Sequence, residues 1–258
     1  MSADAPHISV IIPAFNEEAY LPRLLRSLDV ARARYHGAVE VIVADNASTD
    51  RTAEVAASFG ARVVPVEQRC IAAARNGGAR AARGDVLCFI DADSSVHPDS
   101  LRAVDEALAD DRCVGGATGV SMERWSPGIV AAWCVMVPLV WVIGVDTGLV
   151  FCRRVDFEAL GGFDEGLRFA EDVVLYLRLK RLGRTRRQRF VRLRRVKALC
   201  STRKWDHHGD WHYLLMVLKA PVYFTLMHRR MDAFADRYWY GPLRPLDDDE
   251  RKRLAPPP

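Results

Sequence analysis

The chain has 258 residues, half of them apolar, a net charge of +4 and six cysteines. This length allows one substantial hydrophobic core, with or without a small appendage. The cysteines are scattered without Cys-x-x-Cys spacing, and the first residues show no basic segment followed by an apolar one. These patterns argue against a disulfide framework, a zinc site and a secretory signal, and we expect a cytoplasmic setting.

Strand-like and helix-like patterns alternate over the first 110 residues. We place Asn16 as the N-cap of the first helix with Glu17 and Glu18 in its first turn, and Ser48 or Thr49 as the cap of the second. Pro98 is placed as the first residue of the fourth helix. The alternation predicts βαβ units and a parallel sheet with right-handed crossovers. The expected strands are 8–12, 39–44, 62–66 and 86–90, and helices are expected after each of them, with stripes of Leu or Val or an Ala-rich segment at 71–83.

Polar residues end three of these strands. Asn16 follows the first strand, Asp45 the second, and Asp91 and Asp93 the fourth. Ligands of parallel sheets bind beyond the carboxyl ends of the strands, so these side chains are expected to converge. Two carboxylates without nearby His or Cys suit a hard cation such as Mg²⁺ or Mn²⁺. For Asp-x-Asp alone, a solvated loop with capping side chains is the alternative.

Regular alternation fades in the second half of the chain. Residues 129–145 carry no charge, contain Pro138 and two tryptophans, and are at the lower limit for a membrane span, so we expect a buried or interfacial element. A strand at 149–152, a turn at Gly161-Gly162, a helix from Glu171 ending at Gly183, and a strand at 190–199 follow.

A basic belt lies between residues 178 and 204, where 13 Lys or Arg occur without any Asp or Glu. Such a belt either meets an anionic partner or is a solvated face. The aromatic and apolar stretch 211–227 is either a tail along a membrane surface or a helix packed on the core.

The ordered motifs resemble the family 2 glycosyltransferases of the GT-A fold over residues 8–183. The resemblance implies a nucleotide-diphospho-sugar donor, a divalent metal and inversion at the anomeric carbon. The motifs are 13–18 (Pro-Ala-Phe-Asn-Glu-Glu), 45–50 (Asp-Asn-Ala-Ser-Thr-Asp), 74–78 (Ala-Arg-Asn-Gly-Gly), 91–93 (Asp-Ala-Asp), 162–164 (Gly-Phe-Asp) and 171–172 (Glu-Asp).

The resemblance also implies roles for single residues. Asp172, with Glu171 beside it, would be the general base, and Asp93 would ligate the metal. The sequence departs from many relatives at Asn46-Ala47, where they have Asp-Gly. By position, the nucleoside pocket would be lined by Pro13, Ala14, Asn16, Glu17 (near the ribose) and Asp45 (to the base), while Asp91 would face the ribose or metal.

Some assignments stay open at the level of sequence. Arg75 meets phosphate or is a surface arginine, and His207 or His208 completes the metal shell or is a bystander. Asp146 to Gly148 should border the acceptor site. The acceptor is expected to be a glycan, a lipid-linked molecule or another hydroxyl compound, with peripheral membrane contact through the belt 178–204 and the stretch 211–227.

We therefore expect an α/β fold with a mostly parallel sheet: a GT-A domain over 1–205, with a nucleotide-binding half 1–110 and an acceptor half 111–205, and a helical tail 206–258. Two other functions remain. A sugar-1-phosphate nucleotidyltransferase would need a glycine-rich phosphate loop after the first strand, and 13–18 contains no glycine. An RNA-binding module would interleave aromatics with the arginines, but Phe190 is the one aromatic in the belt, and we expect no nucleic acid.

Overall fold

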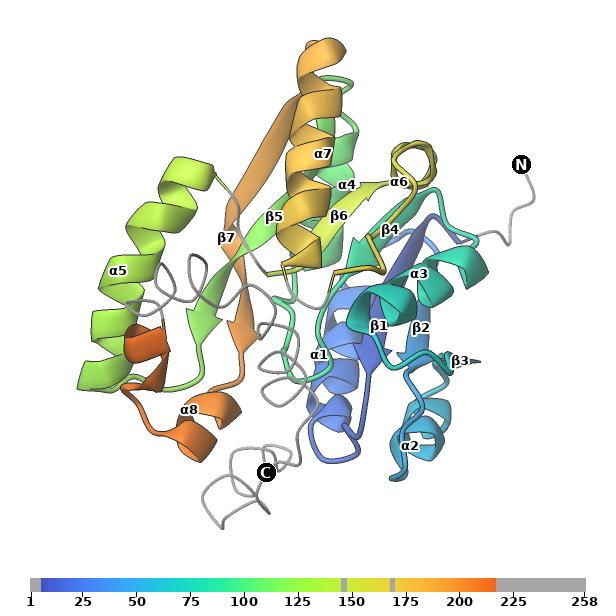
Figure 1. The fold of residues 1–258 in the computed structure, drawn as a ribbon. Helices are drawn as coiled ribbons and strands as arrows, with labels where there is room; N and C mark the ends of the chain where they lie inside the picture. The colour runs from blue at the N-terminus through green and yellow to red at the C-terminus, as the bar shows by residue number, and fades with distance from the viewer. Residues whose placement is uncertain (1–5, 145–147, 168–169, 217–258) are drawn as a thin grey trace. The chain divides into compact units, whose positions relative to one another are not determined.

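The computed structural model describes residues 6–144, 148–167 and 170–216. These residues form two compact units: 6–121 with 148–167 and 170–200, and 122–144 with 201–216. The strands are β1 (Ile8–Ala14), β2 (Val39–Asp45), β3 (Arg62–Pro65), β4 (Val86–Phe89), β5 (Cys113–Met122), β6 (Val150–Arg153) and β7 (Arg189–Cys200). The helices are α1 (Leu21–Ala33), α2 (Thr52–Ser58), α3 (Ile71–Ala81), α4 (Ser100–Leu108), α5 (Pro127–Ile143), α6 (Arg154–Ala159), α7 (Glu171–Thr185) and α8 (Arg203–His208) (Figure 1).

The strands form one sheet in the order β3-β2-β1-β4-β6-β5-β7. β1 pairs in parallel with β2 and β4, and β2 with β3, whereas β6 runs antiparallel to both β4 and β5. β5 therefore points the same way as β1 to β4, and β6 is reversed between them. The predicted α/β fold with a mostly parallel sheet is confirmed, and the carboxyl ends of β1, β2 and β4 lie at one edge.

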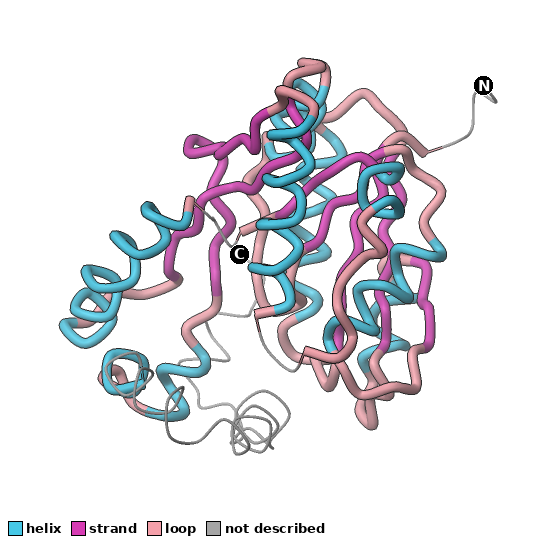
Figure 2. Tube along the Cα trace, turned by 45° about the horizontal axis from the view of Figure 1, so that its top comes forward, coloured by secondary structure: helices cyan, strands magenta, loops and turns pink. Residues whose placement is uncertain are grey.

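Helices cover both faces of the sheet, as Figure 2 shows. On one face, alternate residues of β1 pack with the leucines of α1 and with apolar residues of α2 and α4 in one buried cluster. The other face carries α3, α6 and α7, and α3 and α7 lie in front of the sheet in Figure 1. Gly78 permits the approach of α3, because a Cβ there would lie 2.5 Å from Ile11 Cγ2. Gly78 thus allows this Ala-rich helix to pack closely against the sheet.

Three predicted helix starts are wrong. α1 begins at Leu21 with no acidic residue in its first turn, so Asn16 is not its N-cap. α2 begins at Thr52, beyond Ser48 and Thr49. α4 begins at Ser100, two residues after Pro98. In the first two cases the polar side chains bind a neighbouring loop instead of their own helix.

The predicted end of α7 at Gly183 is also wrong, because this helix continues to Thr185. A Cβ on Gly183 would lie 2.9 Å from Val114 Cγ1 and 3.0 Å from the Gln188 carbonyl oxygen. Gly183 is therefore a contact point with the neighbouring strand rather than a left-handed helix cap.

The uncharged run 129–145 begins inside α5, a 17-residue helix that contains Pro138. Within the described ranges, no helix combines the length and apolar character needed to span a bilayer. Predictions for Asp146, Thr147 and residues 217–258, which include most of the stretch 211–227, lie outside the described residues.

Candidate active site

The loops after β1 and β2 are joined by side-chain hydrogen bonds at the carboxyl edge of the sheet. The backbone N–H of Asn16 donates to Ser48 Oγ (3.0 Å), and Asn16 Oδ1 accepts from the N–H of Thr49 (2.8 Å). The N–H of Glu17 donates to Thr52 Oγ1 (2.8 Å), and the Glu17 side chain is buried. These contacts fix both loops as one unit beside Pro13 and Ala14.

Asp45 and Asn46 end β2 with different roles. Asp45 Oδ1 accepts from the N–H of Ser48 (3.2 Å), while its side chain stays half-buried at the edge. Asn46 is buried and donates through Nδ2 to the carbonyl oxygens of Val66 (3.3 Å) and Gln68 (2.5 Å). Asn46 therefore braces the segment after β3.

Ala47 occupies the left-handed region with φ of 58°, the conformation for which glycine is better suited. This is the position where the sequence departs from the Asp-Gly of many relatives. An alanine there costs about 1 kcal/mol of local strain.

A buried ion-pair network links α3, the end of β4 and the start of α7. Arg75 Nη2 binds Asp91 Oδ1 at 2.8 Å, and Arg75 Nη1 binds Glu171 Oε1. The guanidinium also lies over the ring of Phe163, 5.2 Å from its centroid. Because the Arg75 side chain is 9% exposed, the surface alternative for this residue is wrong. Sequence reasoning missed that its partners are carboxylates from two distant segments.

Burial and charge oppose each other in this network. Burial alone would lower the pKa of Arg75, but the negative charges of Asp91 and Glu171 outweigh it and hold that pKa above its ordinary value. Burial raises the pKa of Glu171, and the positive charge of Arg75 limits the rise. The network thus depends on the arginine to keep a buried carboxylate ionised.

Asp172 lies beside this network in the first turn of α7. Its Oδ1 accepts from the N–H of Val173 (2.7 Å), and the side chain is half-buried. Its negative charge acts on Arg75 and on the buried Tyr176, whose pKa is raised first by burial and then by Asp172. Ala170, immediately before α7, has φ of 59°. A strained backbone residue thus precedes the two predicted catalytic carboxylates.

Asp93 lies close to β7 as well as β4. Its carbonyl oxygen accepts from Arg23 Nη2 (2.5 Å). Burial, followed by the charges of Asp93 and Asp91, raises the pKa of Cys200 at the end of β7 to about 12. The N–H of Ser95 donates to the Leu199 carbonyl oxygen (2.9 Å), so the segment after Asp93 lies beside the end of β7.

The donor set at this edge is made of oxygen atoms, which suits Mg²⁺ or Mn²⁺. Asp91 is 54% exposed, so its carboxylate is accessible even though one oxygen binds Arg75. Among the residues that the structure describes, no group of three His, Cys, Asp or Glu is placed to hold an ion. Asp91 and Asp93 supply carboxylate oxygens of the kind that such a cation binds, and a cation site formed by the two stays a prediction.

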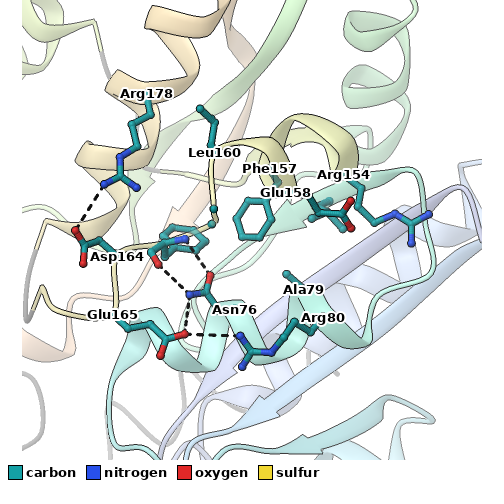
Figure 3. Close-up of a pocket in the computed structure, with 14 residues that line it drawn as sticks. Asn76, Ala79, Arg80, Arg154, Phe157, Glu158, Leu160, Asp164, Glu165 and Arg178 are labelled. Atoms are coloured by element: carbon teal, nitrogen blue, oxygen red, sulfur yellow. Dashed lines mark hydrogen bonds and ion pairs between the residues drawn. The ribbon is translucent and has the colours of Figure 1, made fainter.

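Asn76 is a further residue that sequence reasoning missed. Its Nδ2 donates to the carbonyl oxygen of Phe163 (2.9 Å) and to Glu165 Oε1 (2.8 Å), while Oδ1 accepts from the N–H of Phe163 (2.9 Å) (Figure 3). Gly162, with φ of 74°, brings the chain close to this amide. Asn76 therefore fixes the turn before α7, at the wall of a cavity of about 670 Å³. The sequence did contain a signal for this role: an asparagine directly after Arg75 in a helix made mostly of alanines.

His207 and His208 lie on α8, in the second unit, with ring centroids 4.5 Å apart. The ring of His212 lies 5.2 Å from that of His208. A contribution of either α8 histidine to a metal shell stays a prediction.

The sheet order, the reversed strand β6 and the carboxylates at the strand ends define a GT-A fold with an acidic carboxyl edge. Residues 9–128 match the family described as glycosyl transferase family 2. This segment is therefore similar to family 2 glycosyltransferases, in agreement with the family that the motifs indicated.

A curated relative is the undecaprenyl-phosphate 4-deoxy-4-formamido-L-arabinose transferase of Pseudomonas aeruginosa, 35% identical over 140 residues. The match covers 48% of this chain and 40% of the relative. The chain thus spans well under two thirds of the length of the curated relatives it matches. For a second relative, a 4,4'-diaponeurosporenoate glycosyltransferase of Staphylococcus haemolyticus, the match covers 28% of the relative.

Two solved structures share the fold. S. aureus TarS in complex with UDP-GlcNAc gives a TM-score of 0.61 at 18% identity, covering 90% of this chain and 70% of that chain. Glucosyl-3-phosphoglycerate synthase from Mycobacterium tuberculosis, with Mn²⁺, UDP and glucosyl-3-phosphoglycerate, gives 0.57 at 24% identity, covering 83% and 79%. At these identities the likeness establishes the fold alone.

Proposed function

We propose that the chain transfers a sugar from a nucleotide-diphospho-sugar to an acceptor hydroxyl. The observation that carries the proposal is the Arg75 network, which connects Asp91 at the acidic strand edge to Glu171 at the start of α7. A donor-binding edge and a candidate base are thereby held in one framework. Sugar transfer needs such a framework, because the anomeric carbon of the donor and the attacking oxygen of the acceptor must be aligned.

The donor is proposed to bind over the joined loops after β1 and β2. Pro13, Ala14, Asn16 and Glu17 would border the nucleoside, and Asp45 would accept a hydrogen bond from the base. The proposal is supported by the hydrogen bonds that preorganise these loops and by the nucleotide ligands named for the two structural neighbours.

Asp91 and Asp93 are proposed to hold Mg²⁺ or Mn²⁺, which would neutralise the leaving diphosphate. The Mn²⁺ named for the mycobacterial synthase supports this choice. Arg75 is proposed to orient Asp91 through the 2.8 Å contact rather than to bind the diphosphate.

Asp172 is proposed as the general base that accepts the proton of the attacking hydroxyl. Its place in the first turn of α7 puts it at the positive end of the helix dipole, beside the proposed donor edge. Glu171 is buried against Arg75 and is proposed to position α7 rather than to touch substrate. Attack from the side of Asp172, opposite the leaving group, would invert the anomeric carbon.

The acceptor is proposed to be lipid-linked. The name of the Pseudomonas relative, an undecaprenyl-phosphate transferase, supports this class. The basic belt 178–204 supports it independently, since exposed cationic side chains attract phosphate and acidic head groups.

A thermal-shift panel of UDP-, GDP-, CMP- and dTDP-sugars, each with and without Mn²⁺, tests the donor site. One nucleotide class should stabilise the protein in a metal-dependent way, by roughly 2.7 kcal/mol at about 100 times its Kd. Asp93→Ala should lose this shift, whereas Asp111→Ala, at an exposed aspartate before β5, should keep it. A full shift in Asp93→Ala, or none with any nucleotide, refutes the proposed site.

A further inference from the structure

Helix α5 combines an entirely apolar sequence with an exposed face. None of its 17 residues, Pro127 to Ile143, is charged or carries a polar side chain other than Cys134. A water-exposed helix normally places charged residues on its outer side, and a helix that is apolar all round is normally buried or in lipid. The sequence of α5 therefore predicts that its outer face is covered.

Among residues 127–138 of α5, whose side chains are described, the exposed ones form one stripe. Val130, Cys134 and Pro138 recur every fourth residue and are all exposed, and Val135 adjoins them. Val130 is 45% and Val135 41% exposed, whereas Ile129 on the opposite side is buried. Scattered exposed valines would be ordinary, but a continuous apolar stripe on a helix without polar residues marks a docking surface.

Tryptophans frame the beginning of this stripe. Trp125 is 51% exposed and meets Trp133 edge to face, with ring centroids 5.3 Å apart. Exposed tryptophan beside an apolar surface is typical of the membrane–water interface, where the ring is apolar and the indole N–H stays hydrated.

The start of α5 is firmly held. Arg124 Nε binds Asp206 Oδ1 (2.7 Å) and its Nη2 binds Asp210 Oδ1 (2.6 Å). A Cβ on Gly128 would lie 2.6 Å from the Asp210 carbonyl oxygen, so the two segments are in close contact. These contacts fix the segment before α5 and the first residues of the helix to the segment around α8.

We propose that the stripe Val130, Cys134, Val135 and Pro138, with Trp125, is an interfacial membrane-binding surface for an anionic bilayer. The length of α5, about 25 Å at 1.5 Å per residue, is short of the roughly 30 Å hydrocarbon core. The helix therefore lies in the interface rather than crossing it. The exposed Trp125 beside the stripe favours lipid over a second copy of the chain, and the net charge of +4 favours an anionic bilayer.

This surface would hold the enzyme where a lipid-linked acceptor is found, a step that rests on the proposed function. Vesicle binding itself does not depend on catalysis. The two proposals can therefore fail separately, and the donor-induced thermal shift reports on the proposed function alone.

Co-sedimentation of the full chain with phosphatidylcholine vesicles and with mixed phosphatidylcholine–phosphatidylglycerol vesicles tests the surface. The chain should bind the mixed vesicles preferentially, and the double substitution Val130→Glu with Val135→Glu should lower the partition coefficient at least about tenfold. Val30→Glu is the matched control, since Val30 is 48% exposed on α1, and it should bind as the wild type does.

Equal binding by the double variant, an equal loss in Val30→Glu, or no vesicle binding by the wild type would overturn the proposal. So would a lipid-free dimer that the double substitution dissociates, since this outcome assigns the stripe to a second copy of the chain. A cooperative urea-denaturation transition like that of the wild type shows that the double variant is folded.

Discussion

The substitution Arg75→Met tests whether the buried network holds the acidic edge and α7 together. The Arg75 and Glu171 side chains are 9% and 7% exposed, so removing the arginine leaves an uncompensated buried carboxylate. Breaking a buried pair in this way costs about 3–5 kcal/mol. The contact with Asp91 adds at most about 1 kcal/mol, because Asp91 is 54% exposed and its charge is screened by water.

The loss of stability caused by Arg75→Met should depend on pH. Because the pKa of Glu171 is raised in the folded protein, its contribution to stability is complete below the ordinary value of 4.5 and is lost as the pH rises through the folded pKa. Because Arg75 limits this rise, the pKa of Glu171 should rise further in Arg75→Met. The destabilisation should therefore be largest at neutral pH and above, and should shrink as the pH falls toward 4.5.

Urea denaturation at several pH values, followed by tryptophan fluorescence, measures these free energies. Adding Glu171→Gln to Arg75→Met should restore about 1–3 kcal/mol at neutral pH, since the buried charge is then gone. Arg80→Met is the matched control: Arg80 is on the same helix, 68% exposed, and should change stability by at most about 0.5 kcal/mol. Additive effects of Arg75→Met and Glu171→Gln, or a loss independent of pH, would refute this reasoning.

Three further predictions concern catalysis and packing. Asp172→Asn should keep the donor-induced thermal shift but lower the transfer rate about 10²–10⁴-fold, and unchanged turnover would remove Asp172 as the base. Asn76→Ala should destabilise the protein by about 1–3 kcal/mol in urea, because it leaves buried backbone groups of Phe163 without partners; a neutral effect would contradict the clamp. Gly78→Ala should cost about 1–3 kcal/mol, since the new Cβ would lie 2.5 Å from a β1 side chain, whereas Gly119→Ala, which meets only a lysine side chain at 3.4 Å, should be tolerated.

The alternation of apolar runs and helical stripes was sufficient to predict the order of elements and the acidic strand edge. Strands buried on both faces have unbroken apolar runs, and the runs Val10 to Ile12 and Val86 to Phe89 are short enough to favour strands. Helix starts were less predictable. Asn16 has a side chain typical of an N-cap, but its Oδ1 instead accepts a hydrogen bond from the N–H of Thr49 in the loop after β2.

Local sequence determined the strands, the helices and the placement of Asp45, Asp91 and Asp93 at strand ends, because hydrophobic periodicity depends only on neighbours in the chain. The tertiary structure decided which charges meet. Arg75 and Glu171 are 96 residues apart, and nothing near either of them indicates the other. Only the packing of α3 and α7 on one face of the sheet excludes water from the pair, and that exclusion gives the contact its strength.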